Sequence, residues 1–192
     1  MKSNFNHTKV FLSCECTGFH QNTTLISLGA AHETTDATFY AEFGDYDYLQ
    51  ARRWVDSRII SNLLFHNKPG KGWCNCSTQE NSTQVYGNSE FIAQCLLDWL
   101  SDIGYVEIWT DANPYAWVLF CELVGGVYSL PGNVYPKAFD LCSVLNVLGH
   151  DPLVDREALV SCHTCNTKTS VQKAVLIKEC YKQVIKGVVT NA

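Results

Sequence analysis

Three short runs rich in apolar and β-branched residues open this 192-residue chain, and they restrict its fold more than any other feature. The runs are Lys9–Cys16, Thr24–Ala31 and Thr38–Phe43, and turn-forming residues separate each from the next. Runs of this length and composition, bounded in this way, are typical of consecutive strands. We therefore expect the chain to begin with three antiparallel strands.

The rest of the chain alternates between helical and strand patterns. Tyr48–Leu64 carries apolar residues at helical spacing, and Asn88 is placed to cap a second helix that runs through Leu100. Tyr105–Thr110 has the apolar density of a buried parallel strand. Further helices are expected to begin at Asn113-Pro114 and to run over Ala138–Leu148 and Ser170–Val189. The pattern predicts one α/β domain over residues 1–192, with a mixed sheet of about five strands flanked by helices.

The segment Phe65–Gly87 follows neither pattern. It is rich in Gly, Asn, Ser and Thr, and we expect a long loop inserted between two helices. Long loops in compact domains are often functional. Because this one carries Trp73 and two closely spaced cysteines, it is a candidate surface for a protein partner.

Composition limits the class of protein. Hydrophobic residues make up 46% of the chain, which is enough for one substantial core. No apolar run reaches transmembrane length, and Met1–His7 is not a signal peptide, so we expect a cytoplasmic protein that does not enter a membrane. The net charge of −5 argues against a broad basic face, because non-specific nucleic-acid binding depends on Lys and Arg.

The first strand carries the first candidate site residues. Side chains alternate between the two faces of a strand, so Ser13 and Glu15 point one way while Cys14 and Cys16 point the other. With the Thr17-Gly18 that follows, this strand resembles the first motif of the DEDD superfamily of 3′–5′ exonucleases, in which apolar residues precede Asp-x-Glu-x-Thr-Gly. Ser13 stands at the position of the Asp.

The resemblance extends along the chain and is closest to the DEDDh type, namely small single-domain exoribonuclease-like proteins of phages and mycobacteria with an RNase H-like fold. Leu25–Ala30 and Thr38–Phe43 match segments that follow the first motif in that family. Val106–Asp111 matches a strand that ends in an acidic residue. Tyr115–Phe120 matches a helix that opens with Tyr-Asp-Trp, which puts Ala116 at the second catalytic Asp.

The last motif of the family, His-Asn-Ala-Leu-x-Asp-Ala, opens a C-terminal helix that corresponds here to Ala174–Tyr181. Counting backwards places Lys168 at the His and Lys173 at the Asp. A competing placement, His150–Asp155, fits the bare pattern His-x-x-x-x-Asp. We rank it lower because Asp155 and the two residues after it match a family stretch that precedes the catalytic helix.

These replacements remove most of the metal ligands that the resemblance implies. Two-metal phosphodiester cleavage needs hard oxygen ligands, and a protonated lysine cannot ligate a cation. Only Glu15 remains, so no cofactor is expected. The alternative is an active 3′–5′ exoribonuclease that binds Mg²⁺ or Mn²⁺ at a site rebuilt from Glu15, Asp111, His150 and Asp155.

The resemblance therefore implies a pseudo-exonuclease that acts by binding a protein or single-stranded RNA. In one interpretation Lys173 forms an ion pair with Glu15 and should lie within hydrogen-bonding reach of it. In the other, Lys168 and Lys173 contact phosphates, and Phe19 stacks on a base. The sequence leaves a homodimer open.

Ten cysteines suggest a third, weaker hypothesis, a zinc-stabilised interaction module without a nucleic-acid role. Structural zinc takes four ligands, often thiolates in closely spaced pairs. The four cysteines that would supply them are Cys74, Cys76, Cys162 and Cys165. Five others lie among apolar residues and are expected to be small buried hydrophobes, namely Cys14, Cys16, Cys95, Cys121 and Cys142.

Overall fold

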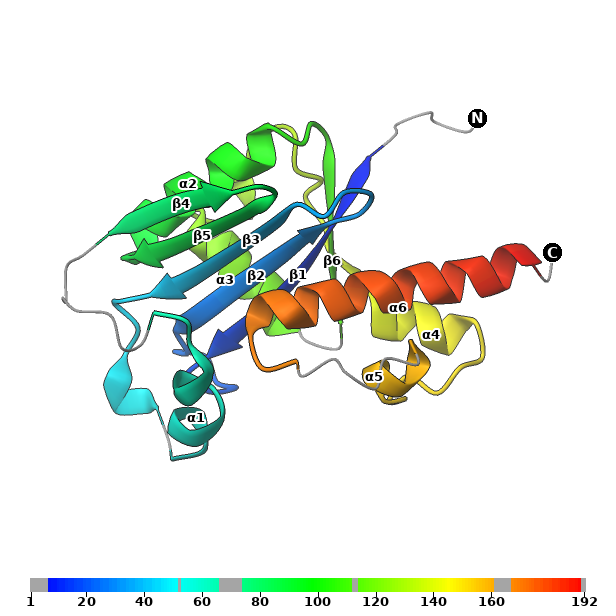
Figure 1. The fold of residues 1–192 in the computed structure, drawn as a ribbon, viewed down its shortest axis with the longest axis horizontal. Coiled ribbons are helices and arrows are strands. Elements are labelled where there is room, and N and C mark those ends of the chain that lie inside the picture. The colour runs from blue at the N-terminus through cyan, green and yellow to red at the C-terminus, as the bar shows by residue number, and fades with distance from the viewer. Residues whose placement is uncertain (1–6, 52, 66–73, 112–113, 161–166, 191–192) are drawn as a thin grey trace.

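A seven-stranded mixed sheet runs through the structure, a computed structural model that describes residues 7–51, 53–65, 74–111, 114–160 and 167–190. Its strand order is β4-β5-β3-β2-β1-β6-β7 (Figure 1). The α/β class is confirmed, and the sheet is larger than the five strands expected. The strands are β1 (Thr8–Cys16), β2 (Leu25–His32), β3 (Thr38–Phe43), β4 (Asn75–Gln79), β5 (Ser82–Gly87), β6 (Val106–Thr110) and β7 (Phe139–Asp140).

The three strands predicted at the start of the chain form the middle of this sheet. β1 pairs antiparallel with β2, and β2 pairs antiparallel with β3. On the other side of β1, β6 runs parallel to it, and β7 runs parallel to β6. The carboxyl ends of β1, β6 and β7 therefore meet at one end of the sheet, where the residues that follow them can approach one another.

Helices cover both faces of the sheet. In Figure 1, α6 lies across the front face with α4 and α5 below it, and α2 and α3 lie behind the sheet. None of the helices in the described part of the chain is both long enough and apolar enough to cross a membrane. The helices are α1 (Arg53–Arg58), α2 (Ser89–Ser101), α3 (Pro114–Leu123), α4 (Leu141–Val147), α5 (Arg156–Leu159) and α6 (Ser170–Thr190).

Strand β1 contributes to a different core on each face. Leu12, Cys14 and Cys16 are buried in the larger cluster, which includes residues of α2 and α3. Phe11 is buried in a second cluster with Ile177 and other residues of α6. The alternation predicted from the sequence is confirmed, and it places Ser13 and Glu15 on the face that α6 covers.

The close approach of α6 to the sheet depends on Gly29. This residue of β2 pairs with Ser13 of β1, and the first turn of α6 lies directly over it. A Cβ atom added at Gly29 would lie 2.2 Å from the backbone nitrogen of Val171, which is closer than any real contact. The missing side chain therefore lets the helix begin against the strand.

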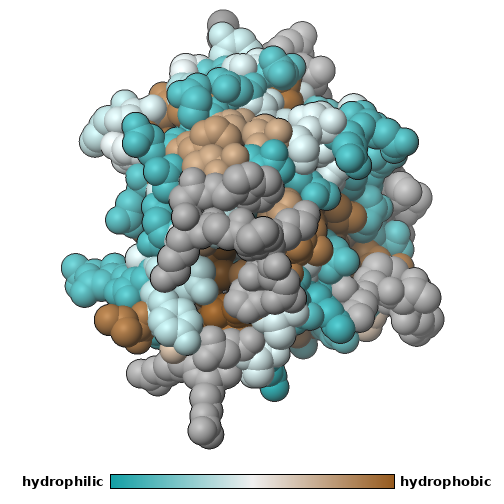
Figure 2. All heavy atoms as spheres, turned by 60° about the vertical axis from the view of Figure 1, so that its left-hand side comes forward, coloured by the Kyte–Doolittle hydropathy of each residue, from teal (hydrophilic) through white to brown (hydrophobic). Residues whose placement is uncertain are grey.

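The prediction of a loop over Phe65–Gly87 is wrong for the part that the structure describes. β4 and β5 form a hairpin there, and β5 extends the sheet by pairing parallel with β3. Thr and Val suit strands, and burial alternates along β5, where Thr83 and Val85 are buried. Polar residues dominate because this hairpin is at the sheet edge. Figure 2 shows this side of the molecule, where hydrophilic residues cover most of the coloured surface.

The continuous helix expected over Tyr48–Leu64 is also wrong. The structure has a 3₁₀ turn at Tyr48–Gln50, the short α1, and another 3₁₀ turn at Ile60–Asn62. Val55, Ile59 and Ile60 are all buried in one cluster with Ile26 of β2. Both isoleucines are buried at the point where the α-helix has ended and the 3₁₀ turn begins, so the break in the helix lies against the strand.

The later elements agree with the sequence patterns. Asn88 caps α2, where its side-chain oxygen accepts a hydrogen bond from the backbone N–H of Phe91 at 3.0 Å. Pro114 is the first residue of α3. The helix expected over 138–148 is shorter, because its first residues form β7 and Asp140 then caps α4.

Candidate functional site

A pocket of about 320 Å³ opens at the carboxyl end of β1, between β1 and helices α3, α5 and α6. Four of the five positions that the exonuclease resemblance assigns to catalytic residues line it, and only Lys168 does not. The residues that give the pocket its chemistry are Ser13, Glu15, Asp111, Ala116, Arg156 and Lys173. Segments far apart in the chain therefore meet at one site.

Glu15 and Lys173 form an ion pair in this pocket. The Lys173 Nζ donates a hydrogen bond to the Glu15 Oε1, so the contact predicted from the sequence is confirmed. The Glu15 side chain is only 12% exposed, whereas that of Lys173 is 42% exposed. The carboxylate is therefore largely shielded from solvent, whereas much of the lysine side chain stays accessible.

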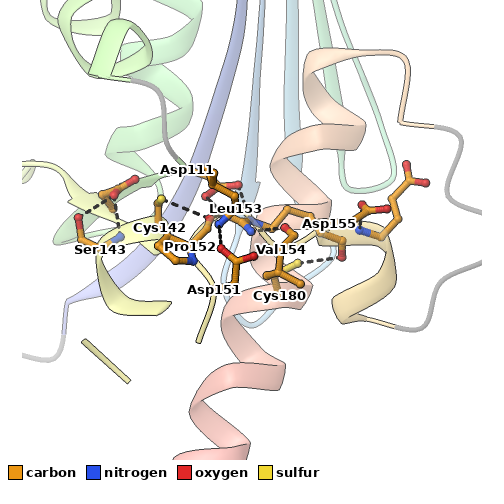
Figure 3. Close-up of polar contacts among 12 residues, drawn as sticks. Asp111, Cys142, Ser143, Asp151, Pro152, Leu153, Val154, Asp155 and Cys180 are labelled. Atoms are coloured by element: carbon orange, nitrogen blue, oxygen red, sulfur yellow. Dashed lines mark hydrogen bonds and ion pairs between the residues drawn. The ribbon is translucent and has the colours of Figure 1, made fainter. Parts of the chain in front are cut away.

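Asp111 and Arg156 form a second ion pair beside the first. The Arg156 Nε and Nη2 each donate to one oxygen of the Asp111 carboxylate at 2.8 Å, which is a bidentate arrangement. The same guanidinium donates to the carbonyl oxygens of Pro152 and Val154, so it also fixes the chain before α5 (Figure 3). The hydrogen bonds that Arg156 donates to Asp111 are the main reason why the pKa of Arg156 is raised.

The two remaining motif positions contribute no carboxylate. Ala116 of α3 is 2% exposed and adds only a methyl group to the pocket wall. Ser13 adds a hydroxyl group next to Glu15. Among the described residues, no group of three or more His, Cys, Asp and Glu side chains is arranged to hold a metal ion. Each of the two carboxylates in the pocket instead has a cationic side chain of this chain as its partner.

Aromatic side chains form the rim on the side of α3. Phe19 lines the pocket and is 67% exposed, and its ring lies 5.5 Å from that of Tyr115 at a tilt of 47°. A large aromatic ring exposed to this extent is available for stacking. Lys168 is exposed just before α6 and is not among the residues that line the pocket.

The competing placement of the last motif is not supported by the geometry. Neither His150 nor Asp155 lines the pocket around Glu15. Asp155 is exposed and caps α5 by accepting a hydrogen bond from the Glu157 backbone at 3.0 Å, and His150 is exposed beyond the end of α4. The proposed rebuilt set therefore keeps only Glu15 and Asp111 in one place.

The cysteine predictions have mixed outcomes. Cys14, Cys16 and Cys121 are buried as expected, but Cys95 and Cys142 are only partly buried. Burial raises the pKa of the Cys14 thiol far above its usual range. For the zinc hypothesis, the pair Cys74 and Cys76 is exposed on and next to β4. The other pair, Cys162 and Cys165, lies outside the described residues.

The roles of two charged residues, Arg156 and Glu42, were not predicted from the sequence. Arg156 was assigned to a family stretch, but its bond to Asp111 was not foreseen, because the two residues are 45 positions apart. Glu42 is 1% exposed and accepts hydrogen bonds from the Tyr40 hydroxyl at 2.6 Å and the Phe65 backbone at 3.0 Å. A charged residue inside the apolar run Thr38–Phe43 was the signal for this buried carboxylate.

The pocket thus combines two neutralised carboxylates, the hydroxyl groups of Ser13 and Thr167, and an exposed aromatic ring. The main hydrogen-bond donors in the pocket are Lys173 and Arg156. Each of them already donates to a carboxylate oxygen of the pocket. Comparison with known proteins adds no assignment: no protein-family model matches this chain, and no curated protein does either.

Proposed function

We propose that this chain is a catalytically degenerate homologue of the DEDDh 3′–5′ exonucleases, a pseudo-exonuclease that acts by binding. The observation that carries the proposal is the ion pair between Lys173 and Glu15. In the alignment with the family, Lys173 replaces the last catalytic Asp and Glu15 is the one catalytic carboxylate that remains. A cation fixed to the chain therefore occupies the position next to the carboxylate that the family gives to a metal ion.

The topology supports the RNase H-like part of this proposal. Three consecutive antiparallel strands are followed, after α1 and the hairpin of β4 and β5, by α2 and a strand, β6, that runs parallel to β1. Four of the five motif positions line one pocket at the carboxyl end of β1, and Lys168 lies outside it. Each of the three motifs thus places at least one residue in the pocket, which supports the alignment.

The donor set of the pocket does not fit a two-metal centre. Such a centre holds two cations about 3.5–4 Å apart through several carboxylate oxygens. Here Ser13 and Ala116 supply no carboxylate, and the oxygens of Asp111 already accept two hydrogen bonds from Arg156. To bind near Glu15, Mg²⁺ would have to displace an ammonium and give up bound water, which it does reluctantly. The donor set of the pocket therefore favours binding over metal-dependent hydrolysis.

Binding of single-stranded RNA is supported by the exposed ring of Phe19 next to Tyr115, because a base can stack on such a rim at about 1–3 kcal/mol per base. The charge of the pocket supports RNA binding less strongly than the aromatic ring does. The two cations and two anions of the pocket balance, so Lys168 outside the pocket would have to supply most of the phosphate attraction. A protein partner is the alternative if RNA does not bind.

The proposal is tested with a labelled single-stranded RNA incubated with the protein and Mg²⁺ or Mn²⁺. We expect no shortening of the oligonucleotide. Shortening that stops with EDTA and with Glu15→Gln would contradict the proposal and favour the metal-dependent alternative, whereas shortening that persists in Glu15→Gln identifies a contaminating nuclease. Binding is measured separately by fluorescence anisotropy at low salt, with Phe19→Ala as the variant expected to weaken it.

A further inference from the structure

Three cysteines gather on the opposite side of the sheet from the ion pairs. Cys76 of β4 pairs with Val85 of β5, and directly paired residues of neighbouring strands point to the same face. Val85 is fully buried in the cluster that lies under α2, so Cys76 also faces α2. Cys74 lies on this face too, because its Sγ atom is 3.1 Å from a Cβ built at Gly87, beside Phe91 of α2.

Cys95 of α2 faces this group from the helix. Its side chain packs against the same cluster, and both Cys95 and Cys76 line one cavity of about 530 Å³. Of the two exposed cysteines, Cys76 raises the pKa of Cys95 more than Cys74 does. This cavity shares no lining residue with the pocket around Glu15.

We propose that Cys76 and Cys95 form a reversible redox site, in which a peroxide converts the two thiols into a disulfide that joins β4 to α2. The site is independent of the proposed function of the Glu15 pocket. Its two sulfur atoms come from different elements, β4 and α2, and both line the same cavity.

The difference in environment assigns a role to each thiol. Cys76 is exposed and is therefore the thiol that a peroxide reaches. Cys95 is half-buried, and burial together with the neighbouring Cys76 raises its pKa to about 11. The exposed Cys76 is thus the sulfur that attacks the peroxide, and Cys95 is the sulfur that then attacks the sulfenic acid.

The reaction balances with one peroxide. The Cys76 thiolate attacks one oxygen of hydrogen peroxide, the O–O bond breaks, and a sulfenic acid and hydroxide form. The Cys95 sulfur then attacks Sγ of Cys76, the S–O bond breaks, and a second hydroxide leaves. The two hydroxides take up the two thiol protons, so two thiols and one hydrogen peroxide give one disulfide and two water molecules.

Cleavage after glutamate tests the bond directly in the full chain. Glu80 and Glu90 lie between the two cysteines, so cleavage puts Cys74 and Cys76 in the peptide 43–80 and Cys95 in the peptide 91–107. After treatment with hydrogen peroxide and alkylation of free thiols, mass spectrometry should detect these two peptides as one linked species. Dithiothreitol should separate them.

Single substitutions identify the partner. Cys76→Ser should abolish the linked species, and Cys74→Ser, which removes a thiol from the same peptide, should leave it unchanged. Linkage that survives Cys76→Ser and disappears in Cys74→Ser would overturn the assignment, as would oxidation that yields no linked peptide in the wild type.

Thermal unfolding gives a second readout that does not depend on peptide recovery. A disulfide that closes a loop of this size should raise the Tm of the oxidised wild type above that of the reduced form by about 5–10 °C. Cys95→Ala and Cys76→Ser should show no such difference between the two redox states. An unchanged wild-type Tm after complete oxidation would also contradict the proposal.

Discussion

Lys173 of α6 donates a hydrogen bond to Glu15 of β1, although 158 positions separate the two residues in the chain. The pair exists because α6 begins directly over Gly29 of β2, next to the strand that carries Glu15. This contact links the fold to the proposed function, since it gives Glu15 an internal cation. Its energetic and chemical consequences can be measured separately.

Lys173→Met should lower the free energy of unfolding by about 1–2 kcal/mol, because it leaves the mostly buried Glu15 carboxylate without its partner. In the double variant Glu15→Gln/Lys173→Met, more than half of this loss should be recovered. Urea unfolding of the two single variants and the double variant measures the coupling. Lys182→Met is the matched control, because Lys182 pairs with Glu179 at the exposed surface of the same helix and should change stability little. Equal losses of unfolding free energy in Lys173→Met and Lys182→Met would show that the ion pair of Glu15 stabilises the protein no more than a surface ion pair does.

Arg156→Lys should lower the free energy of unfolding by about 1–3 kcal/mol even though the charge is kept. A lysine cannot reproduce the bidentate bond to Asp111 together with the bonds to Pro152 and Val154. Hydrogen exchange should also become faster in the chain before α5. The exposed Arg58 of α1 is the control, since Arg58→Lys should be close to neutral. An unchanged exchange rate in Arg156→Lys would mean that the guanidinium does not hold this segment.

Gly29→Ala should destabilise the protein by more than about 2 kcal/mol, because the new methyl group would meet the backbone of α6 and not a movable side chain. The first turn of α6 would have to shift, and Lys173 would move with it. Gly132→Ala serves as the control, since a Cβ at Gly132 meets nothing within 4 Å. Chemical unfolding compares the two variants, and similar stabilities would contradict the close approach of helix and strand.

The stability of the β2–β3 connection should depend on pH through His32. Its Nδ1 accepts hydrogen bonds from the backbone N–H groups of Thr34 and Thr35, both at 3.2 Å. Burial, with a smaller effect of Lys178 against the opposing charge of Glu33, lowers the pKa of His32 below 6.5. The unfolded chain therefore binds a proton first as the pH falls. The contribution of His32 is complete above about pH 6.5 and is lost as the pH falls through the folded pKa.

His32→Asn is the matched variant for this pH dependence, because an amide oxygen can accept the same hydrogen bonds without titrating. Urea unfolding at pH 7.5 and pH 5 should show a smaller loss of stability in His32→Asn than in the wild type. If the two proteins lose the same stability between these pH values, His32 does not cause the change.

Local patterns predicted the centre of the fold well. The alternation in β1 and the apolar runs of β2 and β3 were sufficient, because burial alternates at the end of β1, whereas β2 and β3 are buried over nearly their whole length. The hairpin of β4 and β5 was not predictable in this way. Its residues are largely polar, so the local pattern does not indicate strands. The hairpin is stabilised mainly by the pairing of β5 with the edge of β3, which is a non-local interaction.

The candidate site was predictable only where the resemblance to a family supplied an alignment. That alignment gave the contact between Glu15 and Lys173 and placed Ala116 in the same pocket. It did not give the pair of Asp111 with Arg156, because an ion pair between distant segments leaves no periodic signal in a sequence. The site of Cys76 and Cys95 was missed for the same reason, since the hairpin that carries Cys76 was itself not foreseen.

Whether Glu15 holds an ammonium in place of a divalent cation is tested most directly by titrating the protein with Mn²⁺ and following free Mn²⁺ by electron paramagnetic resonance. The wild type and Glu15→Gln should leave the same amount of Mn²⁺ free at every concentration, because the carboxylate is already paired with Lys173. One Mn²⁺ bound per chain in the wild type and lost in Glu15→Gln would contradict the account.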